Sequence, residues 1–225
     1  MNRSIRRIHL GSALGLLISL PLATNAPAAA PLPPVLVQAR QAIAAARSYR
    51  LTESTISTDH FGTTLTSFVA TVVRQGKTLK MSIITKDRQV DGKKDTTDMV
   101  IGAKHTCIRL TGQGAWNCTM IGNMSSLLNS ALSFTPTASK TSHSTFAPAG
   151  SRVVQGQDCA GFNEVDTSSS FLTHSTIWFS IASKLPVQVT SNGVFFNKAN
   201  PSKDTTTMVW SNWNDPSLSI PNVGA

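Results

Sequence analysis

The stretch TTLTSFVATVVRQGKTLKMSIITK, residues 63–86, decides the fold class of this chain. Two runs rich in Thr, Val and Ile, 63–74 and 78–86, flank the turn dipeptide Gln75-Gly76. In the second run apolar and polar residues alternate, which is the period of a strand with one buried face. Strands joined by so short a connection are antiparallel neighbours, because a parallel return needs a crossover of a dozen or more residues. The stretch therefore predicts a β-hairpin within an antiparallel meander.

A similar composition continues on both sides of this stretch. Runs rich in β-branched residues lie between turn signals such as Asp91-Gly92, Gly112-Gln113-Gly114 and Asn192-Gly193. Together with the two runs above, they predict about ten strands. The further strands are expected at 49–58, 98–101, 105–110, 115–119, 152–166, 170–181, 186–190 and 205–213.

Two segments have helical periodicity instead. Residues 35–47 are Ala-rich with apolar residues at helical spacing, and residues 123–133 place Met and Leu side chains opposite a Ser/Asn face. Residues 134–150, rich in Ser, Thr, Pro and Ala, predict a long surface loop in the position of a lid. The expected fold class is α+β: a curved antiparallel sheet with two or three short helices covering its concave face.

The N-terminus has the organisation of a cleavable signal peptide. Arginines 3, 6 and 7 precede an uncharged run at 10–23 and the small-residue pattern Ala26-Pro27-Ala28. The apolar run is shorter than the roughly 20 residues that span a bilayer, which favours cleavage over a retained anchor. We expect a secreted or periplasmic protein. Its expected parts are a signal peptide at 1–28, a Pro-rich leader at 29–34, a single domain at 35–217 and a tail at 218–225.

The charge of the chain argues against a nucleic-acid-binding protein. Loss of the signal's three arginines lowers the formal net charge from +9 to +6. The remaining lysines are scattered among turns and strands, whereas a nucleic-acid-binding protein concentrates them on one face or helix. We expect a soluble monomer, with an anionic membrane surface as a secondary partner.

Cysteine usage agrees with export. Cys107, Cys118 and Cys159 form no C-x-x-C redox motif. A two-residue turn at Gly112-Gln113 places Cys107 opposite Cys118, which predicts a disulfide suited to an oxidising compartment. Counting residues from this turn also makes Cys107 and Cys118 a hydrogen-bonded pair, whose geometry is less favourable for a cross-strand disulfide. A shifted register or a bridge to Cys159 therefore stays open.

Catalytic and metal sites are not indicated. His105 and His174 lie on predicted strands without an acid at triad spacing, and the chain has no G-x-S-x-G motif. Asp91, Asp95 and Asp98 alternate with lysines in a pattern typical of a solvated turn rather than a calcium loop. We expect no catalytic residue, no metal and no cofactor.

The predicted sheet offers more apolar surface than two short helices can cover. This surface forms either a ligand cavity or a filled core, and periodicity alone does not separate the two.

The order of elements and several short motifs resemble the LolA-like and LppX/LprG-like lipoprotein-carrier superfamily. The motifs are Met99-Val100-Ile101-Gly102-Ala103-Lys104, Trp116-Asn117-Cys118, Gly156-Gln157-Asp158-Cys159, Lys184-Leu185-Pro186-Val187 and Trp210-Ser211-Asn212-Trp213-Asn214-Asp215-Pro216. The resemblance spans nearly the whole chain after the signal peptide. It implies an unclosed half-barrel wrapped around helices, whose apolar concave interior receives acyl chains of lipids or lipoproteins. It also implies a carrier rather than an enzyme. The lipid-attachment cysteine of mycobacterial members is missing, which favours a freely diffusing carrier.

We therefore expect an exported, non-enzymatic carrier or binding protein whose partner is a lipid, an acyl chain or a lipidated protein. Met and Phe side chains in such a lining adapt to different chains. The expected apolar lining is Phe68, Met81, Ile83, Ile101, Leu128, Ile177 and Phe179. Two alternatives remain: a structural or interaction module of the cell envelope with a filled core, and an unrecognised secreted hydrolase that uses His105 or His174.

Overall fold

The computed structural model describes residues 33–75, 78–88, 94–101, 105–110, 114–120, 143–196 and 201–223. The expected signal peptide, most of the Pro-rich leader and the expected helix at 123–133 lie outside these residues and stay predictions. Among the described residues, no helix has the length and apolarity that a membrane crossing requires.

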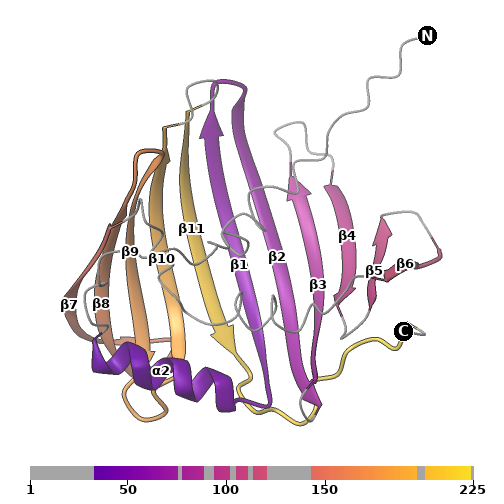
Figure 1. The fold of residues 1–225 in the computed structure, drawn as a ribbon, viewed down its shortest axis with the longest axis horizontal. Coiled ribbons are helices and arrows are strands. Elements are labelled where there is room, and N and C mark those ends of the chain that lie inside the picture. Colours follow the sequence, from indigo (N-terminus) through magenta and orange to yellow (C-terminus); the bar gives the residue numbers. More distant parts are fainter. Residues whose placement is uncertain are drawn as a thin grey trace, which may run out of the picture.

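The strands of the described residues form one antiparallel sheet of eleven strands (Figure 1). In chain order they are β1 (Ser48–Asp59), β2 (Gly62–Gln75), β3 (Thr78–Arg88), β4 (Lys94–Ile101), β5 (His105–Leu110), β6 (Asn117–Met120), β7 (His143–Val154), β8 (Gln157–Thr167), β9 (Phe171–Ser180), β10 (Pro186–Phe195) and β11 (Ser202–Ser211). Their spatial order is β6-β5-β4-β3-β2-β1-β11-β10-β9-β8-β7. Two meanders, β1–β6 and β7–β11, are joined where β1 pairs with β11. Since β6 and β7 lie at opposite ends of this order, the sheet is unclosed, which confirms the predicted half-barrel.

A single helix of the described residues, α2 (Pro34–Ala45), crosses one end of the sheet (Figure 1). It begins with a proline in its first turn, where a missing N–H leaves no hydrogen bond unmade. It ends earlier than the predicted 35–47, because Ala46 is already extended. Leu36, Ala39 and Ile43 are its buried residues, and they recur at helical spacing. The apolar stripe predicted for this segment therefore faces the sheet.

The C-terminal motif at 210–216 holds the junction between α2 and β1. The Trp213 ring contacts the Tyr49 ring at a centroid distance of 4.6 Å. The Arg47 N–H donates a hydrogen bond to the Asn214 side chain at 2.7 Å, and the Ser48 hydroxyl donates to the Asp215 carbonyl at 2.8 Å. These contacts hold the segment after β11 against the junction between α2 and β1.

The region from 134 to 166 differs from the prediction. The expected surface loop at 134–150 is wrong in its last part, since β7 already begins at residue 143. The single strand expected at 152–166 is the end of β7 and most of β8. Gln155 and Gly156 connect them with φ values of 51° and 75°, the geometry of a type I′ hairpin turn. The first turn position holds Gln instead of the Asn or Asp that is typical of this turn, so the turn was not predicted from the sequence.

The dipeptide Asn192-Gly193, predicted as a turn, lies inside β10 instead. Gly193 pairs with Thr173 on β9 and with Asp204 on β11. Partners on both sides satisfy the backbone of this segment, so tertiary pairing outweighs its local turn preference.

Candidate functional site

Side chains on the concave face, the face against which α2 packs, are arranged in rows because neighbouring strands pair residue by residue. Near α2 the rows are apolar: Leu51 pairs with Ala70 on β2 and with Trp210 on β11. Leu36 and Ala39 of the helix belong to the same buried cluster. We call this region the apolar half. Its sheet residues are Tyr49, Leu51, Phe68, Ala70, Val72, Phe162, Ile177, Phe179, Val189, Met208 and Trp210.

Farther from α2 the same face becomes polar within one step along each strand. We call the first polar line the polar row; it consists of Thr55 on β1, Thr206 on β11, Ser191 on β10, Ser175 on β9 and Glu164 on β8. These residues are consecutive partners in the register. The Thr55 and Thr206 hydroxyl oxygens lie 2.9 Å apart, and Ser175 donates a hydrogen bond to Ser191 at 3.0 Å. The concave face therefore joins an apolar half to a row of hydrogen-bonding groups.

One carboxyl group, that of Glu53, lies inside the apolar half. Glu53 is only 4% exposed, and its partners in the register are Phe68 and Met208. Burial raises the pKa of Glu53 to about 7, although the hydrogen bond from the Thr55 hydroxyl to Oε1, at 3.2 Å, acts in the opposite direction. Glu53 therefore changes its charge in the neutral pH range.

Acidic side chains also mark the β8 end of the polar row. Burial raises the pKa of Glu164 to about 7, and the negative charge of Asp166 acts in the same direction. The Ser144 hydroxyl donates a hydrogen bond to Asp166 at 3.2 Å. Burial raises the pKa of Asp166, and that hydrogen bond opposes the shift. Negative charge is therefore already crowded at this end.

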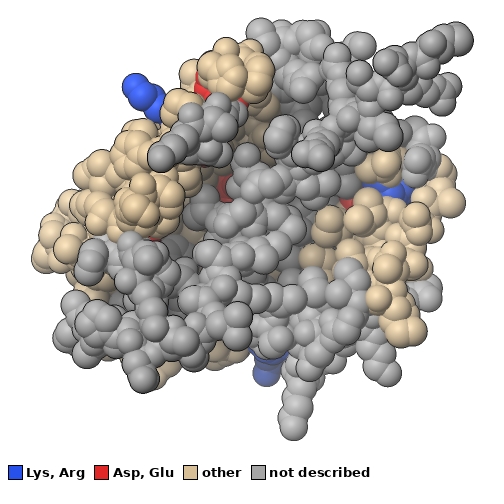
Figure 2. Space-filling view, turned by 45° about the horizontal axis from the view of Figure 1, so that its top comes forward, with Lys and Arg blue, Asp and Glu red and all other residues tan. Residues whose placement is uncertain are grey.

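Basic side chains of the same strands point the other way. On β1 and β7–β11 the Lys and Arg residues are Arg50, Arg152 and Lys203, all exposed on the convex face. On the concave face Asp204 accepts a hydrogen bond from the Ser57 hydroxyl at 2.6 Å. In Figure 2 Lys and Arg atoms project at the outline at the upper left and at the bottom and also appear between other residues at the right, whereas Asp and Glu atoms appear as small areas between other residues. The concave face of these strands is thus acidic in a chain with a net positive charge.

The predicted lining residues fall into three groups. Phe68, Ile101, Ile177 and Phe179 all lie in the core cluster with α2. Met81 and Ile83 occupy β3 positions that pair with Ile101 and Met99 of β4. Leu128 lies outside the described residues. The structure brings four predicted side chains together, and their contact with a ligand stays a prediction.

The polar residues of the concave face were missed from the sequence. One local signal points to them: β1 alternates as Tyr49, Leu51, Glu53 and Thr55, with an acid where the period of two expects an apolar residue. The remaining members of the polar row come from β8–β11, and only the pairing of β1 with β11 brings them beside Thr55.

The two candidate histidines are not part of this site. His174 is exposed, on the face opposite Glu164 and Asp166. Within the described ranges, no hydrogen bond or ion pair joins His174 or His105 to an acid. The same ranges contain no cluster of three or more His, Cys, Asp or Glu residues suited to a metal ion. The geometry described thus assembles no histidine-based hydrolytic site.

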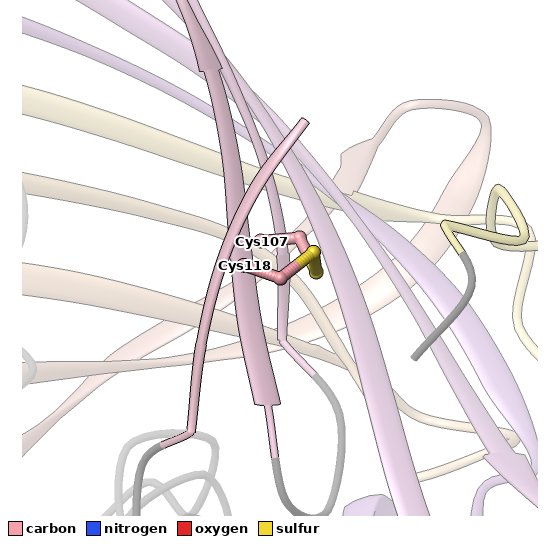
Figure 3. The surroundings of a disulfide bond; sticks show 2 residues. All are labelled: Cys107 and Cys118. Carbon is pink, nitrogen blue, oxygen red and sulfur yellow. A yellow bond between two sulfur atoms is a disulfide. The ribbon is translucent and has the colours of Figure 1, made fainter. Parts of the chain in front are cut away.

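The predicted disulfide is present between β5 and β6 (Figure 3). Cys107 pairs with Cys118 in the register obtained from the turn, and Cys159 is a free, buried thiol. The two Cα atoms are 4.0 Å apart, closer to the narrow, non-hydrogen-bonded pair than to the wide pair. The register and the partner that the sequence left open are therefore settled.

Comparison with known protein families and with curated protein sequences gives no match. The fold, however, matches solved structures. LprF from Mycobacterium bovis is 13% identical at a TM-score of 0.50, over 84% of this chain and 95% of that chain. A DUF1329 family protein from Desulfovibrio piger is 11% identical at a TM-score of 0.34, over 83% of this chain and 92% of that chain. The likeness to LprF shows that the chain has the LolA-like and LppX/LprG-like fold its motifs predict.

Proposed function

We propose that this protein is an exported, non-enzymatic carrier or binding protein for lipid, an acyl chain or a lipidated protein. The observation that carries the proposal is the apolar half of the concave face, against which α2 packs. The fold supports it, because the superfamily that the chain resembles holds acyl chains on this face.

The energetics of an acyl chain suit such a surface. Burial contributes about 0.8 kcal/mol per methylene group, so a chain needs apolar area and length rather than a fixed set of polar partners. Aromatic and Met side chains, such as Phe68 and Met208, adapt to chains of different shape.

Two measurements test the proposal. Lipid extracted from the purified mature protein is identified by mass spectrometry, and binding is measured with the neutral dye N-phenyl-1-naphthylamine. Met208→Asn places an amide on the concave face, while Val209→Asn places the same group on the convex face of β11. We expect about tenfold weaker dye binding for Met208→Asn alone, since one poorly paired polar group costs about 1.4 kcal/mol. An extract without lipid, together with no dye uptake, contradicts the proposal.

We further propose that the hairpin end opposite α2 contacts an anionic membrane surface. Phe61, at the β1–β2 tip, is 83% exposed, and its N–H donates a hydrogen bond to Asp59 at 2.8 Å. Lys203 pairs with Thr58 beside this tip, and the half-exposed Phe196 follows β10 at the same end. Exposed aromatic rings beside cationic groups favour the interface of anionic bilayers.

Sedimentation with vesicles tests this contact. Phe61→Ser is expected to weaken binding to vesicles that contain phosphatidylglycerol, because the ring no longer enters the interface. Met120→Ser removes a side chain that is 76% exposed on β6 and serves as the matched control. Equal losses for both variants, or binding that does not depend on phosphatidylglycerol, contradict the proposed contact.

A further inference from the structure

The polarity of the concave face changes along the length of its strands, from apolar near α2 to polar farther away. β9, β10 and β11 each carry apolar residues near α2 and a hydroxyl residue one step farther, as in Met208 followed by Thr206; on β1, Glu53 lies between Leu51 and Thr55. Successive residues on one face of a strand are about 6.6 Å apart. An amphiphile whose chain lies on the apolar half therefore has its head group beside the polar row.

The polar row is rich in hydrogen-bond acceptors and poor in donors. Thr206 is 3% exposed, so its hydroxyl is largely shielded from water. When Thr55 donates its only hydroxyl proton to Glu53, it accepts from Thr206, and this chain ends on a carboxylate. Among the described residues, Thr55 is the only donor to the Glu53 carboxyl group, which can accept about four hydrogen bonds. No described residue donates a hydrogen bond to the Glu164 side chain.

On β1 and β7–β11 the described charges of this face have one sign. Glu53, Glu164, Asp166 and Asp204 lie on it, while the Lys and Arg residues of β1 and β7–β11 are exposed on the convex face. A negatively charged head group placed here meets like charges and finds few donors. A head group that donates hydrogen bonds is favoured instead, because the carboxyl and hydroxyl oxygens of this face can accept its hydrogen bonds.

We propose that Glu53 and the polar row form the subsite for the ligand's head group, and that this head group is a non-anionic hydrogen-bond donor, a hydroxyl or an ammonium group. The subsite rests on the proposed carrier function and adds the orientation of the ligand: acyl chain toward α2, head group toward the β1–β2 tip. It selects against fatty-acid carboxylates and lipid phosphates.

The test uses three ligands with the same tetradecyl-length chain: monomyristoylglycerol, tetradecylamine and myristate. Each displaces N-phenyl-1-naphthylamine from the mature protein at pH 8, where myristate carries its charge. We expect the better of the two donor ligands to displace the dye at about one tenth of the myristate concentration, the effect of one good hydrogen bond. Preference for the glycerol ester assigns a hydroxyl head group, and preference for the amine assigns an ammonium group.

Variants test whether the preference for donor ligands arises from the polar row. Thr206→Val removes a hydroxyl of the polar row, and Thr205→Val makes the same change on the convex face of β11. Thr206→Val is expected to reduce the tenfold preference to about threefold, and Thr205→Val to leave it intact. Ser191→Ala, at a half-buried position of the same row, repeats the test should Thr206→Val fail to fold.

Two results overturn the inference while leaving the carrier function in place. One is displacement by myristate at the same or lower concentration than the donor ligands, and the other is a preference unchanged in both Thr206→Val and Ser191→Ala. If no ligand displaces the dye and no lipid is extracted, the carrier function fails together with the subsite.

Discussion

The substitution Glu53→Gln tests how the buried carboxyl group on the concave face affects stability. Glu53 lies between Phe68 and Met208 with one hydrogen bond, from Thr55. Gln keeps the shape and the acceptor oxygen but carries no charge. The variant therefore removes the cost of burying a carboxylate while leaving the packing nearly unchanged.

The size of the effect follows from the pKa of Glu53. Its pKa rises from 4.5 to about 7 on folding, because burial disfavours the charged form. Between these values the folded state binds more protons than the unfolded state, so the free energy of unfolding falls as pH rises. This contribution to stability is fully present below pH 4.5 and lost above about pH 7. The difference corresponds to about 3 kcal/mol.

We expect Glu53→Gln to gain about 2–3 kcal/mol at pH 8 and little at pH 4.5. Urea unfolding followed by tryptophan fluorescence measures this at several pH values. The pKa of Glu164 is also raised to about 7, so the variant keeps part of the pH dependence. Asp158→Asn, an exposed acid on β8, is the matched control. A variant less stable than wild type at pH 8, or one with an unchanged pH profile, refutes the argument.

Two further changes probe the scaffold. Gly161→Ala places a Cβ atom 2.5 Å from Trp178 Cζ3, so we expect a loss of about 1–3 kcal/mol in urea unfolding, whereas Gly114→Ala meets nothing within 4 Å and should cost far less. Replacing both Cys107 and Cys118 by Ser opens a loop with a sequence separation of 11, and we expect a loss of about 2–3 kcal/mol; a melting temperature equal to that of the oxidised wild type contradicts this.

Local pairings could be predicted from the sequence because their information is local. Residues 63–86 form the predicted hairpin of β2 and β3, with Gln75 paired to Thr78. Counting outward from one turn placed Cys107 opposite Cys118 but left a shifted register or a bridge to Cys159 open, and the structure shows the first of these pairings. In the hairpin a period of two and a short connection restrict the register to one solution.

The misses were places where local preference and tertiary structure disagree. Gln155-Gly156 makes a tight turn without its usual Asn or Asp, and Asn192-Gly193 has a turn sequence but is held in β10 by strands on both sides. Neither outcome can be read from a short window, because backbone pairing with distant residues decides it.

What the sequence by itself determined is the kind of protein: an antiparallel meander of about ten strands with an amphipathic helix near the start. What only the tertiary structure decided is the pairing of β1 with β11, which joins two meanders from opposite ends of the chain. That pairing sets Thr55 beside Thr206 and buries Glu53 against Met208. Hydrophobic periodicity states which face a residue takes, but not which distant strand lies beside it, so the polar row exists only once the sheet is assembled.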